Sequence, residues 1–331
     1  MDRKESKKNL IRSLFLSEPS WTKPLLAKQI GVSTVTMNIL IDELLQDGEI
    51  IAVGKERSTV GRPSTMYRLN AEKFSYLLVS IVEHDQALRL EGRLIDGRKE
   101  IVAQKDADYP DVSLPALLDF IKGLLLESPH PPLSVAIAIP GKSVDGTVAI
   151  SWWDKMNGWR IEETVTETFH VPAHIENDAN LATIGFAHRL GIDSKEGVVG
   201  LYYPHLSRPG ASFFYDEQLI TGTDSLAGEV KYLPFFSSEQ STVYTLEQEV
   251  DFTVRILALY TILLAPKHIL VHINNVNGNV LGQKLDAALK DMGIPIKPEL
   301  LVSEDYEEHV YIGLLWLAQK ELPFKMRRNV K

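Results

Sequence analysis

Three short segments at the start of the chain carry apolar residues at helical spacing, and two strand-like segments follow them. The helical segments are 7–16, 23–30 and 34–46, and the strand-like segments are 49–53 and 66–69. Pro24 lies in the first turn of the second helix and Gly31 follows its last turn, which are usual signals for a helix start and stop. The pattern predicts three helices and a β-hairpin within the first 70 residues.

From residue 71 onward the pattern is that of a larger α/β body. Its first part predicts one α/β lobe of three antiparallel strands, a helix and a buried strand, at 76–83, 88–94, 101–105, 114–127 and 133–139. Its second part alternates helices with strands. Helices are expected at 162–170, 179–190, 246–264, 280–292 and 311–320, and strands at 173–175, 197–203, 211–215 and 268–273.

A polar triplet, Glu176-Asn177-Asp178, stands where the strand ending at Ile175 gives way to the helix beginning at Ala179. Open α/β sheets bind their ligands at such positions, outside the carboxyl ends of strands. An amide beside a carboxylate can donate hydrogen bonds to hydroxyl groups and accept them. The alternative is that Asn177 or Asp178 only caps the helix. These residues alone leave both interpretations open.

Residues 151–159 are rich in aromatic side chains and irregular in pattern, which predicts a loop. They include Trp152, Trp153 and Trp159, with Asn157 between them. Sugars combine apolar C–H faces with hydroxyls, so tryptophan faces beside amide and carboxylate groups suit a sugar site. A packed surface loop is the competing interpretation.

Charge is distributed unevenly along the chain. Residues 1–73 hold 12 Lys and Arg against 9 Asp and Glu, whereas the rest holds 23 against 35, for a net charge of −9. A basic front on an acidic body suits a nucleic-acid module joined to another domain. The chain has no cysteine, which excludes disulfides and thiolate metal sites. Neither a signal peptide nor an apolar run of roughly 18 residues is found, so we expect a cytoplasmic protein without a membrane span.

The order of helices and hairpin is that of a winged helix-turn-helix. Exposed positions at the start of the third helix are short and polar and can reach base edges or phosphates in a major groove: Ser33, Thr34, Thr36 and Asn38. Arg57, Arg62 and Arg68 lie in or beside the wing. Arg62 stands in the stiff turn Gly61-Arg62-Pro63, which can carry its guanidinium into a minor groove. A three-helix protein-interaction module is the competing interpretation.

Four stretches of the body resemble, in order and spacing, the ROK family of sugar-responsive repressors and sugar kinases. They are Ala136-Ile137-Ala138-Ile139-Pro140-Gly141, Asn157-Gly158-Trp159, Glu176-Asn177-Asp178-Ala179-Asn180 and Gly222–Glu229. The resemblance covers residues 75–322 and implies a two-lobed, actin-like or ribonuclease-H-like α/β fold. The winged helix in front resembles the xylose and N-acetylglucosamine repressor branch. We therefore expect a DNA-binding domain at 1–70 and an effector-binding and dimerisation domain at 71–331.

The resemblance implies roles for single residues. Asn177 and Asp178 match the pair that hydrogen-bonds sugar hydroxyls, and in the kinases the residue matching Asp178 takes the proton from the attacking hydroxyl. Asn157 matches another sugar contact, and Glu229 matches the carboxylate of the family's Gly-Glu-x-Gly-His motif. With Glu176 of the triplet, these residues form the expected effector site.

The chain departs from the kinases of the family at the loops that hold ATP. Where those open with Asp-x-Gly-Gly-Thr, this chain has Ser80-Ile81-Val82-Glu83-His84-Asp85, which is acidic and lacks glycine. Residues 204–210 keep one glycine of a second phosphate loop, and Asn274-Asn275 replaces the Gly-Gly of an adenosine loop. Since phosphoryl transfer needs positioned phosphates and a metal, ATP-dependent kinase activity is not expected.

The zinc site of the family is also missing from the sequence. Its ligands are the His of that motif and three cysteines, whereas here the His position is Tyr232, the preceding glycine is Lys231, and cysteine is absent. No metal and no other cofactor are expected. Tyr232 can donate a hydrogen bond to the effector in place of the His, and Lys231 adds a charge that favours an acidic or phosphorylated ligand.

These features predict a transcriptional regulator, most simply a repressor. Its winged helix binds a palindromic double-stranded operator, and a carbohydrate-derived effector between the lobes shifts DNA affinity by favouring one domain arrangement. A homodimer is expected because palindromic half-sites match a two-fold protein. The helix at 246–264 carries part of its interface or packs in the core. Two alternatives stay open: a sugar kinase with a DNA-binding front, and a regulator whose body is a ligand-free dimerisation scaffold.

Overall fold

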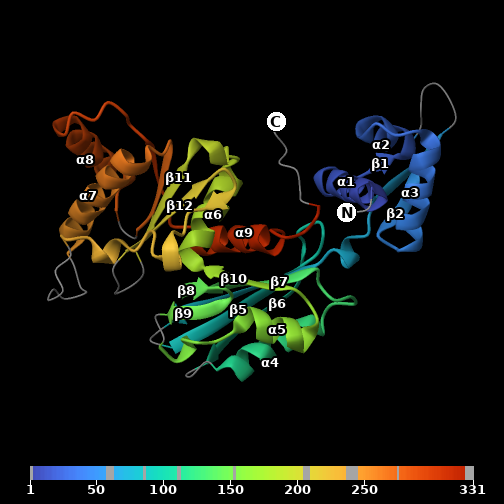
Figure 1. Ribbon diagram of the computed structural model, residues 1–331, viewed down its shortest axis with the longest axis horizontal. Helices are drawn as coiled ribbons and strands as arrows, with labels where there is room; N and C mark the ends of the chain where they lie inside the picture. The colour runs from blue at the N-terminus through green and yellow to red at the C-terminus, as the bar shows by residue number, and fades with distance from the viewer. Residues whose placement is uncertain are drawn as a thin grey trace. The chain divides into compact units, whose positions relative to one another are not determined.

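The computed structural model describes residues 3–56, 63–84, 87–109, 113–151, 154–203, 209–235, 245–273 and 276–324 (Figure 1). Several predicted features lie outside these ranges: Arg57, Arg62, Asp85, Trp152, Trp153, residues 204–208 and Asn274-Asn275. The chain divides into two compact units. Unit 1 comprises Met1–Ile137, Ile161–His174 and Leu317–Lys331, and unit 2 comprises Ala138–Arg160 and Ile175–Trp316.

The N-terminal module of unit 1 has the predicted helices and hairpin. Its elements are α1 (Arg3–Ser17), α2 (Lys23–Ile30), α3 (Thr34–Gln46) and an antiparallel sheet of order β1-β3-β2, with β1 (Trp21–Thr22), β2 (Ile50–Glu56) and β3 (Ser64–Leu69). The apolar stripe of α3 is buried: Met37, Leu40, Ile41 and Leu44. Gly31 ends α2 with a φ of 75°, a left-handed conformation that glycine adopts without steric cost.

Residues from far along the chain complete the core of this module. Phe74 and Phe324 are buried members of it, and Leu133 packs against it. The rings of Phe74 and Phe324 meet edge to face at 5.8 Å, and the Arg12 guanidinium lies 5.5 Å above the Phe324 ring. The domain boundary at residue 70 stays a prediction, because the core around α1 to α3 includes side chains from beyond it.

The first α/β sheet has the strand order β10-β7-β4-β5-β6. Its strands are β4 (Tyr76–His84), β5 (Ala87–Ile95), β6 (Ile101–Tyr109), β7 (Ser134–Ile139) and β10 (Ala173–Asn177). The antiparallel β4–β5–β6 arrangement confirms the prediction. Helices α4 (Leu114–Leu125) and α5 (Ile161–Phe169) lie on one face of this sheet (Figure 1). The division between the units passes within β7 and β10.

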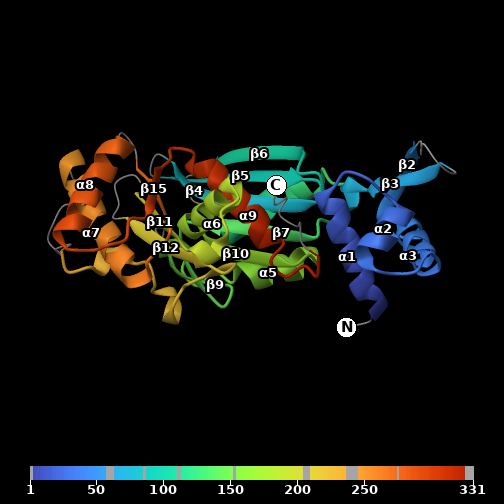
Figure 2. The same cartoon turned by 90° about the horizontal axis from the view of Figure 1, so that it is seen from above.

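The sheet of unit 2 has the strand order β13-β12-β11-β14-β15. Its strands are β11 (Val198–Tyr202), β12 (Gly210–Tyr215), β13 (Gln218–Leu219), β14 (His268–His272) and β15 (Glu299–Val302). Strands β11, β14 and β15 are parallel. Helix α6 (Asp178–Leu190) covers one face, and α7 (Leu246–Leu264) and α8 (Gly278–Asp291) cover the other (Figure 2).

Successive side chains of β11 and β14 point to opposite faces of the sheet, which explains why helices pack on both faces. Val199 and Val271 join the core beneath α7 and α8, whereas Val198 and Leu270 join the core beneath α6. Apolar residues of α7 are divided: Ile256 and Leu257 are buried, but Ile262 and Leu263 are exposed. A role of α7 in dimerisation therefore stays a prediction, and its core role is confirmed for the buried residues.

Two features of unit 2 differ from the sequence-based expectation. Helix α9 spans Tyr306–Ala318 and so begins five residues before the predicted start at Tyr311. Its first turn holds Glu307 and Glu308, which suit the positive end of a helix but interrupt the apolar stripe on which the prediction was based. A hairpin of β8 (Gly141–Val144) and β9 (Thr147–Ser151) follows β7 and turns at Asp145-Gly146, where both residues have positive φ.

Among the described residues, no single helix is long and apolar enough to cross a membrane. The pair α2 and α3 meets that criterion only when both are counted together, across a bend of 114°.

Candidate functional site

Asn177 is the N-cap of α6. Its Oδ1 accepts a hydrogen bond from the backbone N–H of Asn180 at 3.1 Å, and its Nδ2 donates to the carbonyl oxygen of Gly141 at 2.9 Å. Glu176 Oε1 accepts a hydrogen bond from Asn180 Nδ2 at 2.9 Å, which fixes the second amide of the motif. The capping interpretation is therefore confirmed for Asn177. The same bonds place the neighbouring Asp178 at the first position of the helix.

Asp178 is a half-buried residue at the start of α6. Its Oδ1 accepts hydrogen bonds from the backbone N–H of Ala179 at 2.9 Å and from Asn177 Nδ2 at 3.1 Å. Burial raises the pKa of Asp178 from its ordinary 3.8 to about 6, although the Ala179 N–H and the Tyr306 hydroxyl act in the opposite direction. Carboxyls with a pKa raised in this way are concentrated at functional sites.

Close packing of α6 on α9 brings Tyr306 to Asp178. A Cβ on Gly185 would collide with the backbone of His309, and a Cβ on Gly313 would collide with the backbone of Leu181. The pairs Gly185–His309 and Leu181–Gly313 run in opposite directions along the two helices, and Arg189 near the end of α6 binds Asp305 just before α9, so the helices cross closely in an antiparallel sense. Burial, followed by the charge of Asp178, raises the pKa of Tyr306 well above its ordinary value of 10.

The Tyr306 hydroxyl is buried and stands in electrostatic contact with Asp178. Its pKa responds to the Asp178 carboxyl and to the Tyr202 hydroxyl, so these three groups form one polar cluster. Tyr306 was not among the predicted site residues, since it lies in the first turn of α9, which the sequence pattern did not indicate.

Aromatic rings fill the carboxyl ends of the parallel strands beside Tyr306. Tyr202 and His272 are the last residues of β11 and β14 and stand in register with each other. The Tyr202 ring stacks on the Tyr306 ring at 3.9 Å, and the His272 ring meets Tyr306 edge on at 5.1 Å. This edge of an α/β sheet is the usual ligand position. In this chain, part of it is occupied by side chains.

A pair of neutral histidines continues the cluster. His272 Nδ1 lies 3.1 Å from the Ser303 carbonyl oxygen, which can only accept, so Nδ1 carries the proton and Nε2 can accept from His309 Nδ1 at 3.4 Å. Burial, followed by the nearby His309, lowers the pKa of His272 to about 4. Burial also lowers the pKa of His309, followed in effect by Arg189. Both rings are therefore uncharged at neutral pH.

Glu229 stands between two lysines. Its Oε1 lies 3.2 Å from Lys142 Nζ and its Oε2 lies 2.8 Å from Lys231 Nζ. Lys142 directly follows Gly141, whose carbonyl accepts the Asn177 hydrogen bond. The β8 strand therefore connects Glu229 with the start of α6, as an effector site built from both would require. Lys142 is a site residue that the sequence did not indicate, because nothing local distinguishes it from a surface lysine.

The loop that carries Glu229 has an unusual backbone. Asp224 and Ser225 have φ values of 51° and 53°, and residues other than glycine in this region cost about 1 kcal/mol or more each. Ser225 Oγ donates a hydrogen bond to the Ser143 carbonyl at 3.1 Å, and Lys142 donates one to the Ser225 carbonyl. Contacts with β8 thus hold the loop in this conformation.

The other predicted effector contacts, Asn157 and Tyr232, are placed less directly. Asn157 is exposed, and its Oδ1 accepts hydrogen bonds from the Ser151 N–H at 2.9 Å and the Ser151 hydroxyl at 3.1 Å. Ser151 stands opposite Gly141 in the β8–β9 hairpin, so Asn157 is linked to Asn177 through that hairpin. Tyr232 is 68% exposed, and the Lys231 ammonium lies 5.3 Å above its ring. In the described ranges, no group of three or more His, Asp or Glu is placed to hold a metal.

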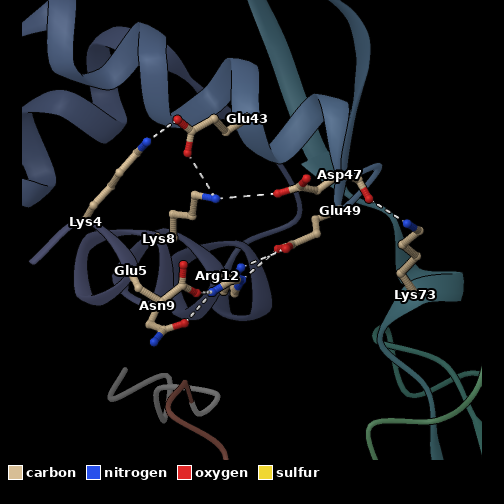
Figure 3. A network of polar contacts seen from close by, with 9 residues as sticks. All are labelled: Lys4, Glu5, Lys8, Asn9, Arg12, Glu43, Asp47, Glu49 and Lys73. Carbon is tan, nitrogen blue, oxygen red and sulfur yellow. Dashed lines mark hydrogen bonds and ion pairs between the residues drawn. The ribbon is translucent and has the colours of Figure 1, made fainter. Parts of the chain in front are cut away.

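A network of charged residues ties α1 to the end of α3 in the N-terminal module (Figure 3). Lys4 and Lys8 of α1 both bind the Glu43 carboxylate, and Lys8 Nζ also lies 3.5 Å from Asp47. Lys73 donates to the Asp47 carbonyl. These contacts fix the carboxyl end of α3 from two sides. The lysines, with Lys4 first, hold the pKa of Glu43 below its usual value.

Arg12 is the buried member of this network. Its guanidinium binds the Glu49 carboxylate with two hydrogen bonds of 2.6 and 2.7 Å and also binds Glu5 and Asn9. Burial lowers the pKa of Arg12, but the carboxylates of Glu49 and Glu5 outweigh it and raise the pKa above its ordinary value. Such bidentate pairing fixes orientation as well as charge.

The predicted DNA-contacting residues are placed as follows. The Ser33 hydroxyl caps α3 by accepting from the Thr36 N–H at 3.1 Å, and it also lies 3.0 Å from the Thr36 hydroxyl. Thr34 and Asn38 are exposed on α3, and Arg68 is exposed on β3. Arg57 and Arg62 lie outside the described residues. The first turns of α3 therefore present a solvent-facing surface, with Ser33 and Thr36 paired to each other.

Curated relatives of this chain are xylose repressors. It is 25% identical to the xylose repressor of Caldicellulosiruptor bescii over 236 residues, which is 69% of this chain and 58% of that protein. It is 22% identical to the xylose repressor of Bacillus subtilis over 241 residues, which is 70% of this chain and 60% of that protein. The chain thus matches less than two thirds of the length of these relatives. No family model matches the sequence.

Solved structures of ROK proteins share the fold. A ROK family transcriptional regulator, a homologue of the Escherichia coli MLC protein, matches with a TM-score of 0.61 at 14% identity, over 94% of this chain and 98% of that one. A ROK family protein from Streptococcus pneumoniae, solved with sucrose, matches with a TM-score of 0.59 at 16% identity, over 75% and 99%. The ROK hexokinase of Thermus thermophilus matches with a TM-score of 0.55 at 14% identity, over 73% and 97%. The chain therefore has the fold of ROK family proteins, and the curated relatives that it resembles in sequence are xylose repressors.

Proposed function

We propose that this chain is a DNA-binding transcriptional regulator, most simply a repressor, whose body binds a carbohydrate-derived effector at Asp178. The observation that carries the proposal is the combination of two parts in one chain. One part is an N-terminal module of three helices and a hairpin, and the other is a polar site around Asn177 and Asp178 that is built on the fold of sugar-binding proteins.

The extent of the structural likeness supports the regulatory part. The ROK transcriptional regulator matches over 94% of this chain, whereas the hexokinase matches over 73%. The part of this chain that the regulator matches is large enough to include the N-terminal module. A winged helix-turn-helix dimer on a palindromic operator is the corresponding proposal for α1 to β3.

A ROK sugar kinase is the second candidate, and Asp178 is the observation that favours it. A carboxyl with a pKa of about 6 can accept a proton from a sugar hydroxyl near neutral pH. Two features argue against this candidate. The loops expected to hold ATP lack all but one of their glycines, and the Tyr202–Tyr306 stack occupies the strand ends beside Asp178. We therefore assign Asp178 to hydrogen bonding of an effector hydroxyl.

Thermal unfolding in the presence of single ligands tests the effector proposal. The panel contains neutral pentoses and hexoses, sugar acids and sugar phosphates, because Lys142 and Lys231 next to Glu229 accommodate either class. We expect one class to raise the melting temperature of the wild type and to release DNA, and neither effect in Asp178→Asn. Asp251→Asn, an exposed carboxylate change on α7, is the control that should respond as the wild type does. A panel without any stabilising ligand would favour the ligand-free scaffold.

Incubation with ATP, magnesium and the same sugars tests the kinase candidate. We expect no sugar phosphate above the background of Asp178→Asn. Turnover that depends on Asp178 would replace the regulatory proposal for the body by an enzymatic one.

A further inference from the structure

Two apolar side chains stand in solvent on the first turns of α3. Val35 is 70% exposed and Ile39 is 52% exposed. They are four residues apart and so lie on one helix face, with Thr34 and Asn38 beside them. The opposite face holds Met37, Leu40 and Ile41, which are buried. Val35 and Ile39 are therefore not part of the module core, and their side chains are accessible to a partner.

We propose that Val35 and Ile39 recognise thymine methyl groups in the major groove and so set the base specificity of the module. This inference rests on the proposed DNA-binding function. Thymine is the base that presents a methyl group in the major groove, and small apolar side chains make van der Waals contact with it. The neighbouring Asn38 amide is suited to the adjacent adenine edge. The face therefore fits A·T-rich half-sites.

The first half of α3 carries no charge that would repel a nucleic-acid partner. Residues 34–41 hold no charged side chain, and the acidic residues of the helix all lie in its second half. Lys4 and Lys8 bind Glu43 (Figure 3). Lys23 binds Asp42 at 2.9 Å, so both acids are paired with lysines of the module. An apolar face with uncharged polar neighbours and a positive helix N-terminus can approach phosphates without like-charge repulsion.

Helix geometry also fixes the expected spacing of the two thymines. Four residues of α-helix rise about 6 Å, and successive bases on one strand are about 3.4 Å apart. If α3 lies along the groove, Val35 and Ile39 reach methyl groups about two base steps apart. The Ser33 cap, bound to Thr36, holds the first turn of α3 rigid for such a contact.

The experiment begins with duplexes selected from a random pool by the full-length protein, since no operator is assumed. The affinity of the selected duplex is measured at fixed salt, with its thymines replaced one at a time by deoxyuridine, which removes only the methyl group. We expect about fourfold weaker binding at one or two positions of each half-site, the effect of losing one buried methyl. Val35→Ala and Ile39→Ala should each abolish the sensitivity at one of these positions.

Leu10→Ala is the matched control, because Leu10 is an apolar residue of α1 that is 40% exposed and lies outside α3. It should keep the full response to deoxyuridine. Unchanged affinity for every deoxyuridine duplex would overturn the inference and leave DNA binding itself intact. An altered sedimentation coefficient in Val35→Ala, with the deoxyuridine response kept, would assign the face to a protein contact instead. Selection of no duplex at all would overturn both this inference and the proposed DNA-binding function.

Discussion

Glu43 and Asp178 are carboxyl groups near the carboxyl end of one helix and the amino end of another. The pKa of each is shifted against the direction that the helix dipole favours. Glu43 lies near the carboxyl end of α3, where the helix dipole disfavours a negative charge, yet its pKa is lowered. Asp178 lies at the amino end of α6, where the dipole favours a negative charge, yet its pKa is raised to about 6. Tertiary surroundings outweigh the helix-end effect in both places.

The difference separates a region built for rigidity from a region built for binding. Lys4 and Lys8 compensate Glu43, so the carboxylate holds α3 against α1 (Figure 3). Desolvation of Asp178 disfavours its charged form, and the Tyr306 hydroxyl offsets this only in part. Its ionised form is therefore costly in the folded protein. A ligand that donates hydrogen bonds to the carboxylate would recover part of that cost, which couples binding to stability.

The largest expected effect comes from the buried end of the N-terminal network. Arg12→Met leaves the Glu49 carboxylate, 18% exposed, without its bidentate cation, and we expect a loss of roughly 3 kcal/mol in the unfolding free energy. Urea unfolding followed by circular dichroism measures it. Lys4→Met, at a 49% exposed side chain of the same network, should cost far less. Equal losses in both variants would mean that burial does not distinguish these pairs.

Replacing Asp178 by Asn should stabilise the protein without ligand. The pKa of Asp178 is higher in the folded than in the unfolded state, so its cost is fully present above pH 6 and disappears as the pH falls toward 3.8. Each pKa unit corresponds to about 1.4 kcal/mol, which gives a gain of about 3 kcal/mol at pH 8. Urea unfolding of wild type and variant at pH 8 and pH 4 tests this. A gain in unfolding free energy of the same size at pH 4 would show that the raised pKa of Asp178 is not its cause.

His272 should produce the opposite dependence on pH. Its pKa of about 4 in the folded protein lies below its ordinary 6.5, so the unfolded chain binds the proton first. Stability is therefore lost as the pH falls from 6.5 to 4, by up to about 3 kcal/mol. NMR titration of the His272 ring should show it neutral at pH 5. A ring that is already protonated at pH 6 would show that the His272–His309 pair is not buried as described.

Local sequence signals predicted the elements but not the surroundings of these groups. The apolar stripe of α3 and the cap at Ser33 are set by neighbours within four residues, and the structure has both. The position of Asp178 at a strand-to-helix transition was likewise readable from residues 173–190. Tyr306 was missed because it meets Asp178 only in the folded chain, where α9 packs closely on α6. Such a contact between distant segments has no periodic signal.

The same limit applies to the charges. Sequence composition indicated a basic front, but the partner of each lysine depends on how α1 packs on α3. The sequence also did not indicate the full surroundings of Glu229, because Lys142, which pairs with it, lies in a hairpin that is distant in the sequence. Residues close in sequence predicted the fold well. The electrostatic state of the site follows from contacts that only the folded chain creates.

The smallest expected effect is that of Glu43→Gln, the counterpart of Asp178→Asn. The pKa of Glu43 is lowered in the folded protein, so its contribution to stability is present above pH 4.5 and lost at lower pH. The variant should therefore be slightly less stable than the wild type at pH 7, opposite in sign to Asp178→Asn. Because the pair with Lys4 and Lys8 faces solvent, high salt should remove the difference. Melting temperatures at low and high salt measure it. Two outcomes would contradict this prediction: a Glu43→Gln variant that is more stable than the wild type, or a difference in melting temperature that high salt does not change. Either would mean that the lysines around Glu43 do not stabilise its charged form.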